Sequence, residues 1–302
     1  MRAGRAQPAG SFIPAALAPW LRPDGYAPLV NAPKGPAPPP VNAGADPSIV
    51  ALVAKGVMDA ELAALVWLLV EARVPLVVAA PQGRVGAGGE LLAGIIGSIH
   101  ADEQTDSIRG PLSAAGASSL VRGRRSGGVL EAGSLAEVHQ VLGAGPLPLS
   151  EDQLTFLGCV LVIGEGSEGR GGRLRVTVAH YVRPLARDAH GHSQRLGPAI
   201  LAAWDPRLER YEHFAWGVLP EIAARLGRRA GDLEADLHHR RDDLAGLAKG
   251  GLTDLAEVRR LIAGYRVRWG DADHGASTGT GHATPGIAHD DKQDDGHGHP
   301  PH

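Results

Sequence analysis

The residues with the clearest chemical potential lie in a glycine-rich stretch between an apolar segment and a helix-like segment. Glycines stand at positions 83, 86, 88 and 89. Gly83 and Gly88 have the spacing of the two glycines in the phosphate-binding loop G-x-x-x-x-G-K-[ST]. In such a loop the backbone N–H groups surround a phosphate, and the dipole of the following helix favours its negative charge. The spacing therefore predicts a nucleotide-phosphate site formed by backbone amides from Gly83 to Gly89.

The two side chains that carry the chemistry of such a loop are replaced here. Gly89 stands at the lysine position and Glu90 at the hydroxyl position. The loop therefore lacks the groups that neutralise the β- and γ-phosphates and bind Mg²⁺. Arg84 is the nearest cation. We expect ATP and Mg²⁺ to bind weakly or not at all; the alternative is an ordinary glycine-rich connection between a strand and a helix.

Two groups of histidines have the residue types of a transition-metal site. His297, His299 and His302 have aspartates nearby and the donors to hold Zn²⁺, Ni²⁺ or Cu²⁺ loosely. The alternative for this group is a tail without a selected function. The segment 188–192 places one aspartate and two histidines at alternate positions. Two imidazoles two residues apart in an extended chain can share a metal, but we favour a polar turn at this segment.

The elements that would position the glycine loop follow from local patterns. Residues 74–80 form a short apolar run without charge, which predicts a strand covered on both faces. Residues 90–96 predict the start of a helix. Asp59 precedes a broad apolar stripe and predicts a helix N-cap. Asp46-Pro47 predicts another helix start, with the proline at the first helical position.

Further elements are predicted along the rest of the chain. Capping boxes are expected at Ser134 with Glu137 and at Ser150 with Gln153. An apolar run at 159–163 and a segment of alternating apolar and polar residues at 174–182 predict a β-hairpin. The remaining predicted elements are helices at about 220–226, 232–249 and 254–265. The stretch 97–130 is rich in Gly, Ser and Ala, and it predicts no clear strand.

Composition bounds the domain organisation. The chain has 302 residues, of which 43% are hydrophobic and 21% charged, and this is enough for a sizeable core. The proline-rich residues 1–45 and the His-, Asp- and Gly-rich residues 271–302 cannot bury enough apolar surface to offset chain entropy. We therefore expect one α/β domain at 46–270 between disordered N- and C-terminal tails.

Charge, cysteine content and hydropathy exclude several classes of protein. The net charge of −3 argues against a nucleic-acid-binding protein. A single cysteine, Cys159, argues against a disulfide framework or a CxxC metal site. No apolar run reaches the roughly 18 residues of a transmembrane helix, and prolines at 14 and 19 interrupt the apolar part that a signal peptide needs. We expect a cytoplasmic protein.

Several stretches resemble one family of ATPases. Residues 61–83, which include the run Leu-Val-Trp-Leu-Leu-Val-Glu and end at the first loop glycine, resemble the segment that leads into the P-loop of type II/type IV secretion and pilus assembly ATPases. Residues 131–139 are similar to the element that follows the Walker B strand of that family, and residues 179–217 to a C-terminal part of it. The resemblance implies an α/β, P-loop NTPase-like core whose sheet is flanked by helices.

The departures from the family pattern concern the residues of catalysis. Besides the lost lysine and hydroxyl, the acidic box and the Walker B strand have no counterpart except Asp102, Glu103 and Asp106, which no apolar strand precedes. The resemblance therefore implies a degenerate member that acts as a regulatory or assembly partner, with weak or no ATP hydrolysis. Its implied partners are copies of itself or secretion and pilus assembly proteins. The alternatives are an active ATPase that uses Arg84, and an interaction protein that binds no nucleotide and has a metal-binding tail.

Overall fold

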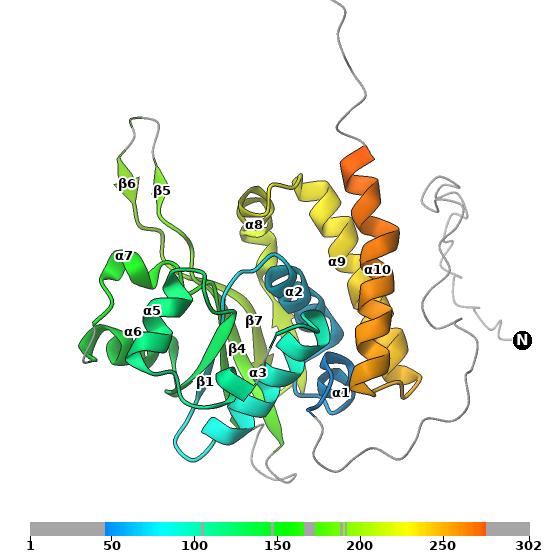
Figure 1. The fold of residues 1–302 in the computed structure, drawn as a ribbon, viewed down its shortest axis with the longest axis horizontal. Coiled ribbons are helices and arrows are strands. Elements are labelled where there is room, and N and C mark those ends of the chain that lie inside the picture. The colour runs from blue at the N-terminus through cyan, green and yellow to red at the C-terminus, as the bar shows by residue number, and fades with distance from the viewer. Residues whose placement is uncertain are drawn as a thin grey trace, which may run out of the picture. The chain divides into compact units, whose positions relative to one another are not determined.

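The computed structural model describes residues 46–103, 106–145, 148–165, 173–187, 190 and 192–275. The predicted N-terminal tail and nearly all of the predicted C-terminal tail lie outside these residues. The chain divides into a unit that ends at Ile262 and a second that begins at Ala263, inside the last helix. The first unit contains a six-stranded mixed sheet with helices packed on it (Figure 1). The predicted α/β class is confirmed at this level.

The sheet has a parallel half and an antiparallel half. Its strand order is β2-β1-β3-β4-β7-β8, where β1 pairs in parallel with β2 and β3, and each later pair is antiparallel. A separate two-stranded ribbon is formed by β5 and β6. The strands are β1 (Leu76–Ala80), β2 (Gly127–Glu131), β3 (Cys159–Glu165), β4 (Leu174–Tyr181), β5 (Ala186–Arg187), β6 (Ser193–Gln194), β7 (Ala199–Asp205) and β8 (Arg210–His213).

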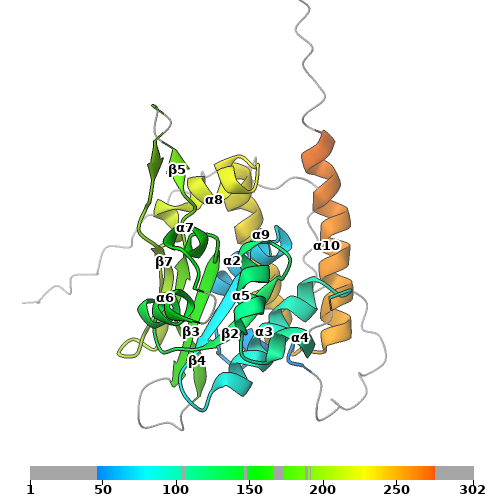
Figure 2. The same cartoon turned by 60° about the vertical axis from the view of Figure 1, so that its left-hand side comes forward.

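The central strand β1 is covered on both faces, as its uninterrupted apolar sequence predicts. All five of its residues are buried. Val78 and Ala80 face helix α3 (Val85–Ile99), and Val77 and Ala79 belong to a core shared with α5 (Ala114–Val121), α6 (Leu135–Ala144) and α7 (Glu151–Leu154). Helices α3 and α6 accordingly lie on opposite sides of the parallel strands (Figure 1, Figure 2). The alternation of side chains along a strand accounts for this division.

A group of three helices packs together beside α3. Helix α2 (Ala60–Glu71) lies along α9 (Ala230–Lys249), and both contact α1 (Ile49–Ala54). Arg240 of α9 is 5% exposed; it pairs with Asp236 and Glu71, and its guanidinium carbon lies 4.4 Å from the centre of the Trp67 ring. The other helices are α4 (Asp106–Arg109), the 3-10 helix η3 (Ala215–Gly217), α8 (Leu219–Arg225) and α10 (Leu255–Gly275).

The sequence predicted most of these elements. The structure corrects two predicted boundaries, the start of the first helix and the end of the folded part. The predicted hairpin is β3 with β4, and the three predicted C-terminal helices are α8, α9 and α10. Helix α10 continues to Gly275, beyond the predicted end of the folded part at residue 270. The prediction that Asp46-Pro47 begins the first helix is wrong, because α1 starts at Ile49 and Ser48 caps it by accepting a hydrogen bond from Ala51 N.

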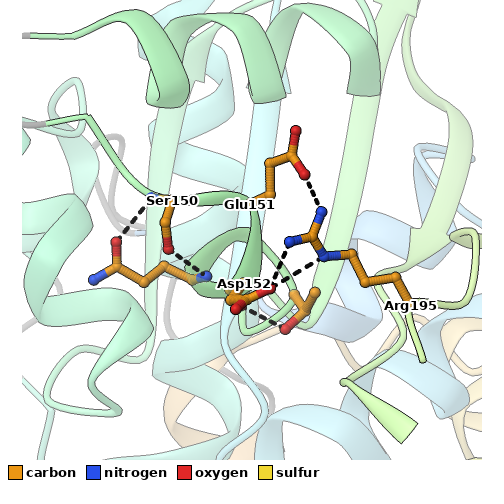
Figure 3. A network of polar contacts seen from close by, with 6 residues as sticks. Ser150, Glu151, Asp152 and Arg195 are labelled. Atoms are coloured by element: carbon orange, nitrogen blue, oxygen red, sulfur yellow. Dashed lines mark hydrogen bonds and ion pairs between the residues drawn. The ribbon is translucent and has the colours of Figure 1, made fainter. Parts of the chain in front are cut away.

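The predicted helix caps agree closely with the structure. The Asp59 carboxylate accepts a hydrogen bond of 2.9 Å from Leu62 N at the start of α2. At α7 the full capping box is present, with Gln153 N donating to Ser150 Oγ at 3.2 Å and Ser150 N donating to Gln153 Oε1 at 2.8 Å. Figure 3 shows this box beside the ion pairs that Arg195 forms with Glu151 and Asp152.

The cap of α6 differs slightly from a full capping box. Ser134 Oγ accepts a hydrogen bond from Glu137 N, as predicted, but the Glu137 carboxylate accepts from Gly133 N rather than from the N-cap residue itself. The caps depend on residues three or four apart, which is why local sequence predicts them well.

The strand β2 lies in the stretch for which the sequence predicted no strand. Two of its five residues, Gly127 and Gly128, lack the side chains that mark a strand in sequence. A Cβ on Gly127 would lie 2.6 Å from the carbonyl oxygen of Leu76 in β1, and one on Gly128 would lie 2.5 Å from Leu112. The glycines are therefore required by close packing, and this requirement is invisible in the local pattern.

Candidate functional site

The β1–α3 connection lies where open α/β sheets bind ligands. Strand β1 stands between β2 and β3, and the three strands are parallel, so their carboxyl ends meet at one edge of the sheet. The chain leaves β1 toward β2 through α3 and later returns to β3 on the other side of β1. Such a reversal of strand order is a topological switch point. The predicted phosphate loop is therefore at a position that suits ligand binding.

The second half of the predicted loop is helical. Gly83 adopts a left-handed backbone conformation with φ of +77°, but α3 begins at Val85, two residues later. Gly86, Gly88 and Gly89 all belong to that helix. The amide of Gly88 donates a hydrogen bond of 2.9 Å to Arg84 O, so this amide has an acceptor within the chain. Only the amides of the first helical turn remain for an anion.

Gly88 and Gly89 serve close packing of α3. A Cβ on Gly88 would lie 3.0 Å from Val129 of β2 and 3.2 Å from Ala80 of β1. A Cβ on Gly89 would lie 2.3 Å from the carbonyl oxygen of Arg109, in α4. Position 89 therefore has no room for a lysine side chain, because α4 packs directly against α3 at this residue.

The loop and the ends of its two neighbouring strands carry one arginine and three carboxylates. Arg84, the N-cap residue of α3, forms an ion pair with Glu165, the last residue of β3, and both side chains are about half exposed. Glu131 ends β2 directly beside Ala80 in the register of the two strands. Glu90 is exposed on the second turn of α3. Sequence reasoning missed Glu131 and Glu165 as loop neighbours. Glu165 follows the apolar run of β3, which was a usable signal, whereas the glycine-rich β2 gave none for Glu131.

Three acidic residues occupy the stretch where the resembled family has its acidic box and Walker B strand, and two of them lie away from the glycine loop. Asp102 and Glu103 follow the C-terminus of α3, and Glu103 accepts a hydrogen bond of 2.6 Å from Ser126 Oγ. Ser126 directly precedes β2, so this carboxylate is at the amino end of that strand, opposite to the edge that carries the loop. Asp106 begins α4. Neither Asp102 nor Glu103 is placed to bind a metal ion at the glycine loop.

The histidine groups form no complete metal site among the described residues. The rings of His190 and His192 are 6.2 Å apart, near the end of the β5–β6 ribbon, while the third predicted ligand, Asp188, lies outside the described residues. The histidines between 297 and 302 lie outside them as well. Within the described ranges, no cluster of three or more His, Cys, Asp or Glu side chains is arranged to hold a metal.

Comparison with protein-family models and with curated proteins gives no match. Within the described part of the chain, no helix combines the length and the apolar character needed to cross a bilayer.

Proposed function

We propose that the chain is a secretion- or pilus-ATPase-like protein with a degenerate nucleotide-binding loop, which acts as a regulatory or assembly partner with weak or no ATP hydrolysis. The observation that carries the proposal is that the β1–α3 connection has the position of a phosphate loop in the sheet but lacks the side chains of one. It lies at the carboxyl ends of parallel strands, as a phosphate loop does, yet position 89 is closed by the Arg109 carbonyl and position 90 carries a carboxylate.

Charge supports the same proposal. Phosphoryl transfer depends on positioning and on neutralising the charge of the transferred phosphate. The loop and the ends of β2 and β3 carry one arginine, Arg84, and three carboxylates, those of Glu90, Glu131 and Glu165. Because ATP is itself a polyanion, this balance disfavours its binding. Arg84 already has Glu165 as its partner, so a phosphate would have to displace a carboxylate to reach it.

The proposal is tested by nucleotide binding and turnover in the purified full chain. We expect a fluorescent ATP analogue to bind with a Kd of about 1 mM or weaker, with or without Mg²⁺. Addition of 1 mM ATP then adds at most about 0.4 kcal/mol to the stability, from RT ln(1 + [L]/Kd), which is a small change in Tm. Phosphate release should equal the background without protein, and sedimentation velocity should be the same with and without Mg-ATP.

The variant Arg84→Ala separates this proposal from an active ATPase. We expect it to leave the nucleotide measurements unchanged, because Arg84 is paired with Glu165. Micromolar binding, or hydrolysis above background that Arg84→Ala abolishes, would instead support the active enzyme. The variant Arg210→Ala is a matched control, since Arg210 is an exposed arginine of β8, at the opposite edge strand of the sheet, and its loss should leave every nucleotide measurement unchanged.

A further inference from the structure

A cavity of about 550 Å³ lies beside the first two turns of α3. Its wall is formed by α3, by the end of α1 with the segment that follows it, and by the start of β4. The volume falls within the roughly 300–1,000 Å³ of small-molecule sites in proteins. Of the predicted phosphate loop, Ala87 and the adjoining Glu90 line this wall, whereas none of its glycines does.

The inner part of the cavity wall is apolar. Leu52 from α1, Val57 from the following segment and Leu91 from α3 are each at least nine-tenths buried in the chain. Leu174, the first residue of β4, is half-buried and completes this part of the wall. An apolar group that enters the cavity would therefore leave water for contact with aliphatic side chains, which is favourable in proportion to the area buried.

The rim of the cavity carries two cations and one carboxylate. Lys55 at the end of α1 and Arg173 before β4 are exposed, as is Glu90 of α3. In the described part of the chain, neither Lys55 nor Arg173 forms an ion pair or a side-chain hydrogen bond. The carboxylate comes from the α3 wall, and the cations come from the α1 and β4 walls, so an anionic group is attracted toward α1 and β4 and repelled from α3.

Other arginines near this region are already engaged, which sets Lys55 and Arg173 apart. Arg109 pairs with Asp46. Arg175, two residues after Arg173, donates a hydrogen bond of 2.7 Å to Gly56 O and lies over the Trp204 ring with a distance of 4.0 Å to its centre. Among the described residues, the positive charge available to a ligand at the cavity therefore comes from one lysine and one arginine.

We propose that this cavity binds a small amphiphilic anion. Its apolar body contacts Leu52, Leu91 and Leu174, and its head group, a carboxylate or a phosphate monoester, lies at Lys55 and Arg173. Glu90 orients the ligand by repelling the head group from the α3 wall. The proposal does not depend on the proposed function, because it requires neither a nucleotide nor a phosphate held by the backbone amides of the loop.

Calorimetric titration of the purified full chain with three eight-carbon probes tests the proposal. Octanoate and octyl phosphate carry the two candidate head groups, and octanamide has a similar body without charge. We expect both anions to bind with one site per chain and octanamide to bind at least about tenfold more weakly, which corresponds to about 1.4 kcal/mol. The stronger of the two anions identifies the head group. Equal affinity of octanamide, or no binding of either anion, would overturn the proposal.

Variants of the two cations give the matched comparison. Each of Lys55→Met and Arg173→Met should weaken octanoate binding about threefold to fivefold, and the double variant by about tenfold or more. Lys249→Met is the control, because Lys249 is an exposed lysine at the end of α9 that does not line the cavity. Unchanged affinity in the double variant, or an equal loss in the control, would contradict the assignment.

A filling variant tests the cavity separately from the charges. Ala54 lines the cavity and is exposed, so Ala54→Trp can occupy part of the volume without disturbing the core. We expect it to abolish binding of both anions while the thermal unfolding midpoint stays close to that of the unmodified chain. Retention of binding in a folded Ala54→Trp protein would place the anions elsewhere and refute the proposal.

Discussion

Gly89 offers the sharpest test of how this loop region is built, through the substitution Gly89→Ala. A Cβ at this position would lie 2.3 Å from the Arg109 carbonyl oxygen, whereas an ordinary contact needs more than about 3.4 Å, so α3 and α4 must separate by about 1 Å. Overpacking of this kind costs about 1–3 kcal/mol. Replacing a helical glycine by alanine stabilises the helix by about 1 kcal/mol, so the expected net loss is about 0–2 kcal/mol.

The matched control is Gly86→Ala in the first turn of the same helix. A Cβ on Gly86 meets no atom within 4 Å, so only the gain in helix propensity remains and we expect about 0.5–1 kcal/mol of stabilisation. For a domain of this size 1 kcal/mol shifts Tm by about 2–4 °C, and calorimetry or guanidinium denaturation will resolve the two variants.

The two substitutions also distinguish packing from phosphate binding. If Gly89 is required by packing, Gly89→Ala lowers stability in the absence of any nucleotide. If it were required by a phosphate, the variant would retain stability and lose nucleotide affinity. A Gly89→Ala protein as stable as Gly86→Ala would refute the reasoning from the Arg109 carbonyl. By the same reasoning, restoring a lysine at position 89 should destabilise the fold rather than create an ATP site.

Three further predictions concern a buried ion pair and two titrating groups. Arg240→Met removes the buried partner of two carboxylates and should lower the free energy of unfolding by about 3 kcal/mol, whereas Arg241→Met should change it by less than about 0.5 kcal/mol; equal losses in guanidinium denaturation would contradict this. Burial lowers the pKa of His213, but the hydrogen bond and charge of Asp59, with a second nearby carboxylate, outweigh burial and raise it overall. The stability that protonated His213 contributes is complete below the unfolded pKa of about 6.5 and is lost as pH rises through the higher folded pKa. Stability measured across that range should therefore fall with pH relative to His213→Gln, and parallel profiles would contradict the ion pair. Burial raises the pKa of the Cys159 thiol to about 12, so Ellman's reagent should leave it unmodified in the native protein and react with it in denaturant; equal rates would show that the strand is open.

Local sequence patterns predicted the elements that depend on neighbours in the chain. The apolar run of β1, the caps at Asp59 and Ser150, and the β3–β4 hairpin were all found in this way. Strand β2 was missed because its glycines are required by contacts with Leu76 and Leu112 rather than by a strand pattern. Pairing with β1 is a tertiary condition, which no window of neighbouring residues contains.

The sequence by itself determined the chemistry that is absent from the glycine loop: no lysine follows Gly88, and no hydroxyl follows Gly89. It also placed the loop between an apolar strand and a helix. Only the tertiary structure decided what the glycines do, because the atom that closes position 89 belongs to Arg109, twenty residues along the chain. Likewise, the cavity beside α3 exists only because the fold brings α1 and β4 together there. The side chains that a segment carries are read directly from its sequence, whereas the space around each side chain is set by residues that folding brings close.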